Sequence, residues 1–513
     1  MGSGVQSIED INRLEGIINS LLQQYSLDEV IVGLRQSQQK LLPFTIAGIS
    51  LFAIRFALPP IARKDNATGI EWDNLRQIAH FVMQYLLADP VSFTPPAENT
   101  YHDSTAVPIL LRTIGNQFPY DFTIWGQYGR SQILYHDLLQ QLTRRTDIPQ
   151  FDIESAFQKI AHIPLMDYID VGFVAFVAAQ AEIAFTGWYF QKARHQGIAL
   201  PDDEAIALVL DQLAADQWQM RALYDQYRQR DHRYAAYDFN PLFVHPIIRP
   251  WKKRDGTSLD DDRLIAPLPN LIIAKLSEGI YRHMFHKYRG EFASYFGHLF
   301  EAYVGVVLSH SLRTTKLLSG SDIKQRYKAG KIPDWVVVDG NTAVVIECKA
   351  TGLPRKAFAT ADKDAIDQGL AAVVDGLVQL YEFDKMCQNR SKGLESLHGC
   401  SKFYHVVVTH EPLYIANSSF LTDVIKQKFI ERVPDADLTF SWVILVVDEL
   451  ERFQPHMAAG IRLTDIIERI GSQSFNEVLT WCQQQSGKTY HDSFLYAYDE
   501  ELYRRLNVPN NAE

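Results

Sequence analysis

The chain has 513 residues, of which 47% are hydrophobic and 22% charged, and its formal net charge is −11. This composition is typical of a globular protein of two or three domains. The negative charge argues against broad attraction to nucleic acid, so any such binding must come from local basic patches. The four cysteines have neither metal-ligand spacing nor the density of a disulfide framework, which predicts a cytoplasmic protein.

Residues 1–235 predict a large helical domain. Apolar residues keep helical spacing through residues 8–21, and Ser26 followed by Glu29 has the pattern of a capping box that opens the next helix. Further on, Pro201 precedes three acidic residues, which predicts a helix from there towards residue 230. Because no cluster in this part has catalytic spacing, we expect the domain to serve sensing or assembly.

Two apolar stretches of this domain, residues 41–58 and 171–190, are long enough to raise the question of a membrane span. The first contains Pro43 and Arg55, and the second contains Gln180 and Glu182. A stretch of about 20 predominantly apolar residues is needed to cross a bilayer. We therefore expect two buried helices and no membrane association.

Residues 236–290 predict an extended connector, because prolines punctuate the segment and short strands are expected at 244–253 and 263–266. This region carries basic residues that are candidates for nucleic-acid binding: Lys252, Lys253 and Arg254. Residues 281–289 also interleave basic and aromatic side chains. Such a segment either contacts phosphates and bases or forms an amphipathic helix with a solvated basic face.

A tight hairpin is predicted where two apolar runs, 335–338 and 343–346, flank a turn containing Gly340 and Asn341. If Asp339 pairs with Thr342, counting outward places Asp334 opposite Glu347. Side chains alternate between the faces of a strand, so Glu347 and Lys349 share the face of Asp334, and Ile346 and Cys348 take the other. Two carboxylates and one ammonium group then converge at the open end of the hairpin.

This arrangement has a chemical use, because adjacent carboxylates repel unless a cation lies between them. Oxygen ligands suit Mg²⁺ or Mn²⁺, and a neighbouring lysine can orient a water or stabilise charge on a phosphate. The alternative is a solvated cluster of charges at the end of an ordinary hairpin. The unbroken apolar run next to Glu347 and Lys349 favours the first interpretation.

Pro333-Asp334 followed by Glu347-Cys348-Lys349 resembles the signature of the PD-(D/E)XK nuclease superfamily, which includes restriction endonucleases, repair nucleases and phage-defence effectors. The resemblance implies that Asp334 and Glu347 are metal ligands, that the Cys348 carbonyl is a third ligand, and that Lys349 positions the attacking water. Many members carry another acid on a preceding helix. Glu301, four residues after Gly297 on a helix expected over 291–309, resembles it and is expected to be a catalytic and metal-binding residue.

Beyond the hairpin, Arg355 and Lys356 lie in a Gly/Pro loop and are candidates for contact with the substrate backbone. Some repair-type members carry a Gln and Tyr motif on the next helix, expected over 365–387. Gln379 is a candidate for nucleic-acid binding there, although Gln368, Gln379 and Tyr381 lack that motif's spacing. Strands at 403–409 and 441–447, with a helix at 419–431 between them, predict a mixed sheet flanked by helices.

The sequence thus predicts a large all-helical N-terminal domain followed by an α/β domain. The latter has a restriction-endonuclease-like mixed sheet at 291–450 and C-terminal helices at 451–513. The expected function is Mg²⁺- or Mn²⁺-dependent hydrolysis of phosphodiester bonds, of DNA rather than RNA, in phage defence. A phage or host protein is the expected trigger, and self-association is a further expectation. The alternative is a catalytically silent scaffold that binds nucleic acid or protein.

Overall fold

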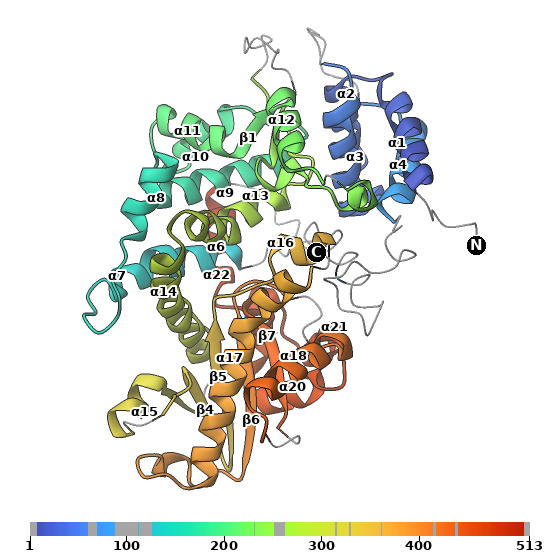
Figure 1. The fold of residues 1–513 in the computed structure, drawn as a ribbon. Coiled ribbons are helices and arrows are strands. Elements are labelled where there is room, and N and C mark those ends of the chain that lie inside the picture. The colour runs from blue at the N-terminus through green and yellow to red at the C-terminus, as the bar shows by residue number, and fades with distance from the viewer. Residues whose placement is uncertain are drawn as a thin grey trace.

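The computed structural model describes residues 8–59, 69–87, 111, 126–229, 231–250, 262–312, 315–327, 330–360, 362–413, 417–436 and 440–506. Helices dominate the described chain, and the remainder includes a mixed five-stranded sheet and a two-stranded parallel sheet. Figure 1 shows the helical N-terminal half above the sheet, with the C-terminal helices beside it.

The first four described helices pack together, and their buried core also takes in residues from 215–220, 235–248 and 265–271. They are α1 (Ile8–Leu22), α2 (Leu27–Gln36), α3 (Pro43–Phe56) and α4 (Trp72–Leu86). The predicted capping box is confirmed, since the Ser26 backbone N–H donates to Glu29 Oε2 at 3.0 Å at the start of α2. The apolar stretch expected at 41–58 is α3, and Pro43 occupies its first turn, where the missing N–H costs no hydrogen bond.

The prediction of a single helix over residues 171–190 is wrong. Helix α9 (Leu165–Ala181) ends before an extended segment, and α10 (Trp188–His195) begins after it. In between, the Phe185 N–H donates to the Leu264 carbonyl at 3.0 Å and the Leu264 N–H donates back at 2.8 Å. This pairing to a residue about 80 positions away satisfies the backbone groups that a continued helix would have satisfied locally.

The helix predicted from residue 201 towards 230 is also interrupted. It is divided into α11 (Asp203–Leu213) and α12 (Gln217–Tyr227) by a short strand, β1 (Ala214–Asp216). This strand pairs in parallel with β2 (Ile247–Arg249), and Ile248 also forms a bridge with Ile265. The described part of the first 235 residues is therefore mostly but not entirely helical.

No single helix among the described residues is long and apolar enough to cross a membrane. Helix α8 (Ile153–Ala161) and α9 satisfy that test only when taken together, and they are bent by 61°. Both α9 and the shorter apolar helix α3 bury most of their residues.

The five-stranded sheet has the order β3–β4–β5–β6–β7, with β3, β4 and β5 antiparallel and β5, β6 and β7 parallel. The strands are β3 (Lys316–Ser319), β4 (Trp335–Asp339), β5 (Thr342–Lys349), β6 (Lys402–Thr409) and β7 (Trp442–Val446). The predicted hairpin register is confirmed, because Asp339 pairs with Thr342 and Trp335 with Ile346.

Helices cover both faces of this sheet. On one face, α17 (Lys363–Gln388) and the crossover helix α18 (Ser419–Arg432) pack on Val345 and its neighbours. On the other, α14 (Glu278–Ser311) and α19 (Val447–Ala458) pack on Ile346 and its neighbours. Helix α14 bends at Arg289, whose φ of 46° departs from helical geometry.

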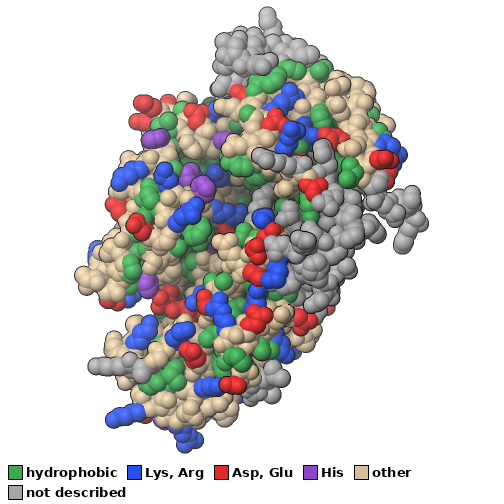
Figure 2. Space-filling model, in the orientation of Figure 1, with side chains coloured by type: hydrophobic (Ala, Val, Ile, Leu, Met, Phe, Trp, Pro, Cys, Tyr) green, Lys and Arg blue, Asp and Glu red, His purple; other side chains and the backbone are tan. Residues whose placement is uncertain are grey.

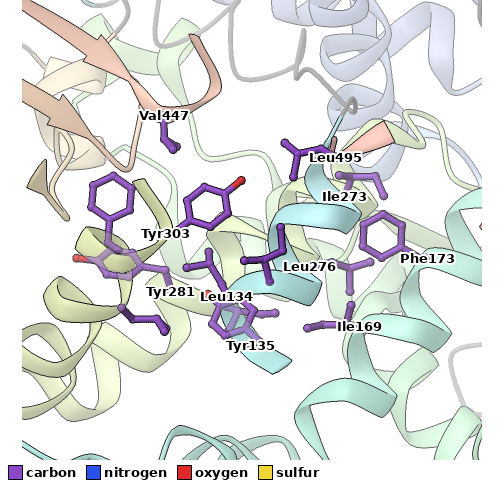
Figure 3. Packing of buried hydrophobic residues seen from close by; sticks show 14 of the residues in the cluster. Leu134, Tyr135, Ile169, Phe173, Ile273, Leu276, Tyr281, Tyr303, Val447 and Leu495 are labelled. Carbon is purple, nitrogen blue, oxygen red and sulfur yellow. The ribbon is translucent and has the colours of Figure 1, made fainter. Parts of the chain in front are cut away.

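The hydrophobic core on the α14 side of the sheet extends into helices that precede the sheet in the sequence and into helices that follow it. It joins Leu134, Tyr135 and Phe173 of the N-terminal half to Tyr281 and Tyr303 of α14 (Figure 3). Shorter or peripheral helices complete the described chain: α6 (Gln127–Gln132), a π-helical turn (Ile133–Leu138), α7 (Leu139–Leu142), α13 (Asn270–Leu276), α15 (Gly320–Arg326), α16 (Arg355–Thr360), α20 (Leu463–Ile470), α21 (Phe475–Ser486) and α22 (Tyr496–Leu506).

Candidate active site

Asp334, Glu347 and Lys349 lie together at the open end of the β4–β5 hairpin. Asp334 immediately precedes β4, and its Oδ2 accepts a hydrogen bond of 2.8 Å from the Cys348 backbone N–H. The Lys349 Nζ lies 2.6 Å from Glu347 Oε1. The alternation of faces predicted for the strand thus places all three groups on the side covered by α17.

Gln379 of α17 completes the contacts of Glu347. Its Nε2 donates to Glu347 Oε2 at 2.7 Å and also to the Ile332 carbonyl at 2.8 Å. Gln379 is a predicted nucleic-acid contact, and the structure places its amide against the carboxylate. Both oxygens of Glu347 therefore have a donor, and the helix fixes the orientation of the carboxylate.

Gly376 is a residue of this site that the sequence analysis missed. It precedes Gln379 by three residues and so lies on the same face of α17. A Cβ at this position would lie 3.1 Å from Lys349 Cε and 3.3 Å from Glu347 Cγ. The absence of a side chain lets α17 approach both residues. A glycine in the interior of a long helix, one turn from a candidate polar residue, is the signal that could have identified it.

Burial shapes the electrostatics of the site. Glu347 is 2% exposed. Burial, followed by the nearby Asp334 carboxylate, raises the pKa of Glu347 to about 8. Burial and the charge of Glu301 likewise raise the pKa of Asp334 to about 6. Burial by itself would lower the pKa of Lys349, but the Glu347 carboxylate more than offsets it and raises that pKa. Ionising both carboxyl groups beside a single ammonium group is therefore unfavourable in this site.

Glu301 approaches this cluster from the second half of α14. Its side chain is 30% exposed, and its Oε2 lies 3.4 Å from His298 Nδ1. Its backbone carbonyl accepts a hydrogen bond of 2.9 Å from Trp335 Nε1, which ties α14 to β4. Trp335 fits there because Gly305 has no side chain, since a Cβ would lie 2.1 Å from the indole ring. Glu301 thus acts on Asp334 and Glu347 through its charge, without a direct hydrogen bond to either.

The remaining predicted site residues are spread more widely. The Cys348 side chain packs on the opposite face of the sheet, and burial raises the pKa of its thiol, so its backbone alone is directed to the site. Lys356 on α16 is exposed and lies 2.7 Å from Asp362 in an ion pair. The side chain of Arg355 and the residues Lys252, Lys253 and Arg254 lie outside the described structure.

The donor set fits a hard divalent cation in its chemistry. Within the described residues, no group of three or more His, Cys, Asp or Glu side chains is close enough to hold a metal ion by itself. Asp334 and Glu347 offer two carboxylates, and Mg²⁺ in proteins is commonly held by one or two carboxylates with water and substrate phosphate as further ligands.

Comparison of the chain with protein-family models, with curated proteins and with solved structures gave no match. The geometry of the site therefore carries the functional argument.

Proposed function

We propose that this protein is a Mg²⁺- or Mn²⁺-dependent nuclease whose core is restriction-endonuclease-like. The observation that carries the proposal is the convergence of Asp334, Glu347 and Lys349 at the open end of one hairpin. Two buried carboxylates whose pKa values are raised by burial and by neighbouring negative charge are destabilised in the absence of a cation. A cation between them would remove that cost.

Each residue has a role in this proposal. Asp334, Glu347 and the Cys348 carbonyl would hold the cation, with Glu301 as a further acid facing it. The cation, when bound, supplies Lewis acidity and a water of lowered pKa. Lys349 stabilises the negative charge that develops on the phosphate and orients the water. Gln379 keeps the Glu347 carboxylate in one orientation and is therefore a positioning residue.

The substrate and the biological setting are further parts of the proposal. DNA is preferred over RNA, and phage defence is the setting we propose by analogy with effectors that join a helical sensing region to a nuclease core. The helical N-terminal half would then respond to a phage or host protein or mediate self-association.

One observation favours a second candidate, a catalytically silent scaffold. Both oxygens of Glu347 already accept hydrogen bonds from protein donors, Lys349 and Gln379. A satisfied polar cluster of this kind is stable without any ligand. The two candidates differ in their response to metal, because a silent scaffold gains no stability from Mg²⁺ or Mn²⁺.

The proposal is tested by incubating the full-length protein with plasmid, linear duplex, single-stranded DNA and RNA, in Mn²⁺ and in chelator. Asp334→Asn is the test variant. Asp339→Asn is the matched control, because it removes a carboxylate from the other end of the same strand. We expect cleavage by the parent and by Asp339→Asn, and none by Asp334→Asn or in chelator. Cleavage that survives in Asp334→Asn would refute this site.

A further inference from the structure

The first half of α14 presents an exposed surface of mixed aromatic and basic character. We call it the α14 surface and define it as Arg282, Phe285, His286, Lys287 and Arg289. Positions 282, 285, 286 and 289 are separated by three, four and seven residues and so share one side of the helix up to its bend. All five residues are exposed, and Phe285 is 44% exposed.

A residue next to this surface fixes the helix to the end of β5, beside the candidate active site. Tyr281 is buried, and its hydroxyl donates to the Ala350 carbonyl at 2.8 Å, one residue after Lys349. The Tyr281 ring stacks on Phe285, with centroids 5.8 Å apart and planes at 18°. Phe285 is thus one helical turn, about 5.4 Å, from a residue that touches the end of β5.

A second contact fixes the helix to the neighbouring strand. Arg282 Nε lies 2.7 Å from Glu411 Oε1, and Glu411 follows β6 by two residues. The strands β5 and β6 are parallel, so their carboxyl ends lie at the same edge of the sheet. The α14 surface therefore has a defined position beside the edge that carries Glu347 and Lys349.

Three polar side chains of this surface, other than Arg282, are available to a ligand. Within the described part of the chain, His286, Lys287 and Arg289 form no ion pair with a carboxylate. This contrasts with the net charge of −11 of the whole chain. Figure 2 shows Lys, Arg and His side chains near a hollow between α14 and α16, above the strands of the sheet.

We propose that the α14 surface binds an unpaired nucleic-acid strand and leads it to Asp334 and Glu347. A base stacks on Phe285, and the adjacent phosphates contact His286, Lys287 and Arg289. An exposed aromatic ring can stack only on a base with a free face, and the bases inside a duplex have none, so the proposal specifies single-stranded substrate or an unpaired end. This inference rests on the proposed nuclease function and adds its substrate class.

The experiment measures binding without cleavage. The full-length Glu347→Gln variant in chelator is titrated against fluorescein-labelled dT20, U20 and a 20-base-pair duplex, with fluorescence anisotropy as the readout. We expect tighter binding of a single strand than of the duplex. Adding Phe285→Ala is expected to weaken single-strand binding roughly tenfold, the scale of one lost stacking contact, and Phe285→Tyr is expected to restore it. Comparing the affinities for dT20 and U20 shows whether DNA or RNA is bound more tightly.

Trp188→Ala is the matched control. Trp188 is an exposed aromatic residue on α10 with Lys192 Nζ 5.5 Å from its ring centroid, but no described contact links it to the sheet. Adding Trp188→Ala should leave the affinity for the single strands unchanged. Equal affinity for duplex and single strand, or unchanged affinity in Phe285→Ala, would overturn the inference even if the parent cleaves duplex DNA. Single-strand binding through Phe285 without cleavage of any substrate by the parent would instead remove the nuclease proposal and leave the binding surface.

Discussion

Gln379 Nε2 donates a hydrogen bond of 2.7 Å to Glu347 Oε2, so the helix that covers one face of the sheet also orients a carboxylate at its edge. The same amide nitrogen contacts the Ile332 carbonyl, which precedes the β4 strand of the hairpin. Gln379 therefore joins α17 to both sides of the candidate site.

Replacing Gln379 tests whether it positions Glu347. We expect Gln379→Ala to lower the cleavage rate about 10- to 100-fold, the range found when the partner of a metal ligand is removed, and to raise the Mn²⁺ concentration needed for half-maximal rate. Gln368→Ala, an exposed glutamine on the same helix, is the control and should cleave as the parent does. A reduced rate with an unchanged Mn²⁺ dependence would argue against a positioning role.

Metal should stabilise the folded protein through Asp334 and Glu347. At an Mg²⁺ or Mn²⁺ concentration 100 times the dissociation constant, the expected gain is about 2.7 kcal/mol, seen as a rise in melting temperature that chelator reverses. Glu347→Gln should lose this rise, and Asp339→Asn should keep it. An equal rise in Glu347→Gln would place the metal elsewhere.

Gly376→Ala separates stability from activity. Alanine is favoured over glycine in a helix interior by about 1 kcal/mol, but the added Cβ lies 3.1 Å from Lys349 Cε and displaces that side chain by a fraction of an ångström. We expect a free energy of unfolding near that of the parent and a reduced cleavage rate. Gly16→Ala in α1, where a Cβ meets no atom within 4 Å, should be more stable and equally active.

Asp499 of α22 predicts a pH dependence of stability away from the site. Burial raises its pKa to about 7, although Tyr490 and the Gly126 N–H donate hydrogen bonds to it. A folded-state pKa above the unfolded value means that the contribution to stability is present at pH 4 and is lost as the pH rises to about 7. Asp499→Asn should therefore gain stability relative to the parent over this range, by on the order of 4 kcal/mol.

Chemical denaturation of both proteins at pH 4, 5.5, 7 and 8 measures this difference. Asp492→Asn gives the opposite sign, because Lys488 lowers the pKa of Asp492, so this carboxylate stabilises the fold more as the pH rises. A constant difference between Asp499→Asn and the parent across the series would show that Asp499 is ionised alike in both states.

A buried ion pair joins a helix that precedes the five-stranded sheet in the sequence to a helix that follows it. Arg130 of α6 donates to both oxygens of Glu451 on α19, at 2.7 and 2.5 Å, and the Tyr303 hydroxyl of α14 donates to the same carboxylate. Removing one partner leaves a buried charge, so Arg130→Met should cost about 3–5 kcal/mol in unfolding free energy. The double variant Arg130→Met/Glu451→Leu should recover much of that loss in the same denaturation measurement.

The hairpin, its register and the shared face of Asp334, Glu347 and Lys349 were predictable from the amino-acid sequence. These features follow from short-range rules, because a two-residue turn sets the pairing and the alternation of a strand sets the faces. The second half of α14, the helices α17 and α18 and the strands β6 and β7 were predictable for a similar reason, since apolar periodicity within each segment is a local property.

Features that depend on contacts between distant segments became visible in the three-dimensional structure and were not predictable from the sequence. The break after α9 follows from the pairing of Phe185 with Leu264, and the break after α11 follows from the pairing of β1 with β2, about 30 residues apart. The roles of Gly376 and Gln379 likewise depend on how α17 lies across β5. Local propensity carries no information about a partner strand or helix elsewhere in the chain, so hydrogen bonding and close packing between elements decided these positions.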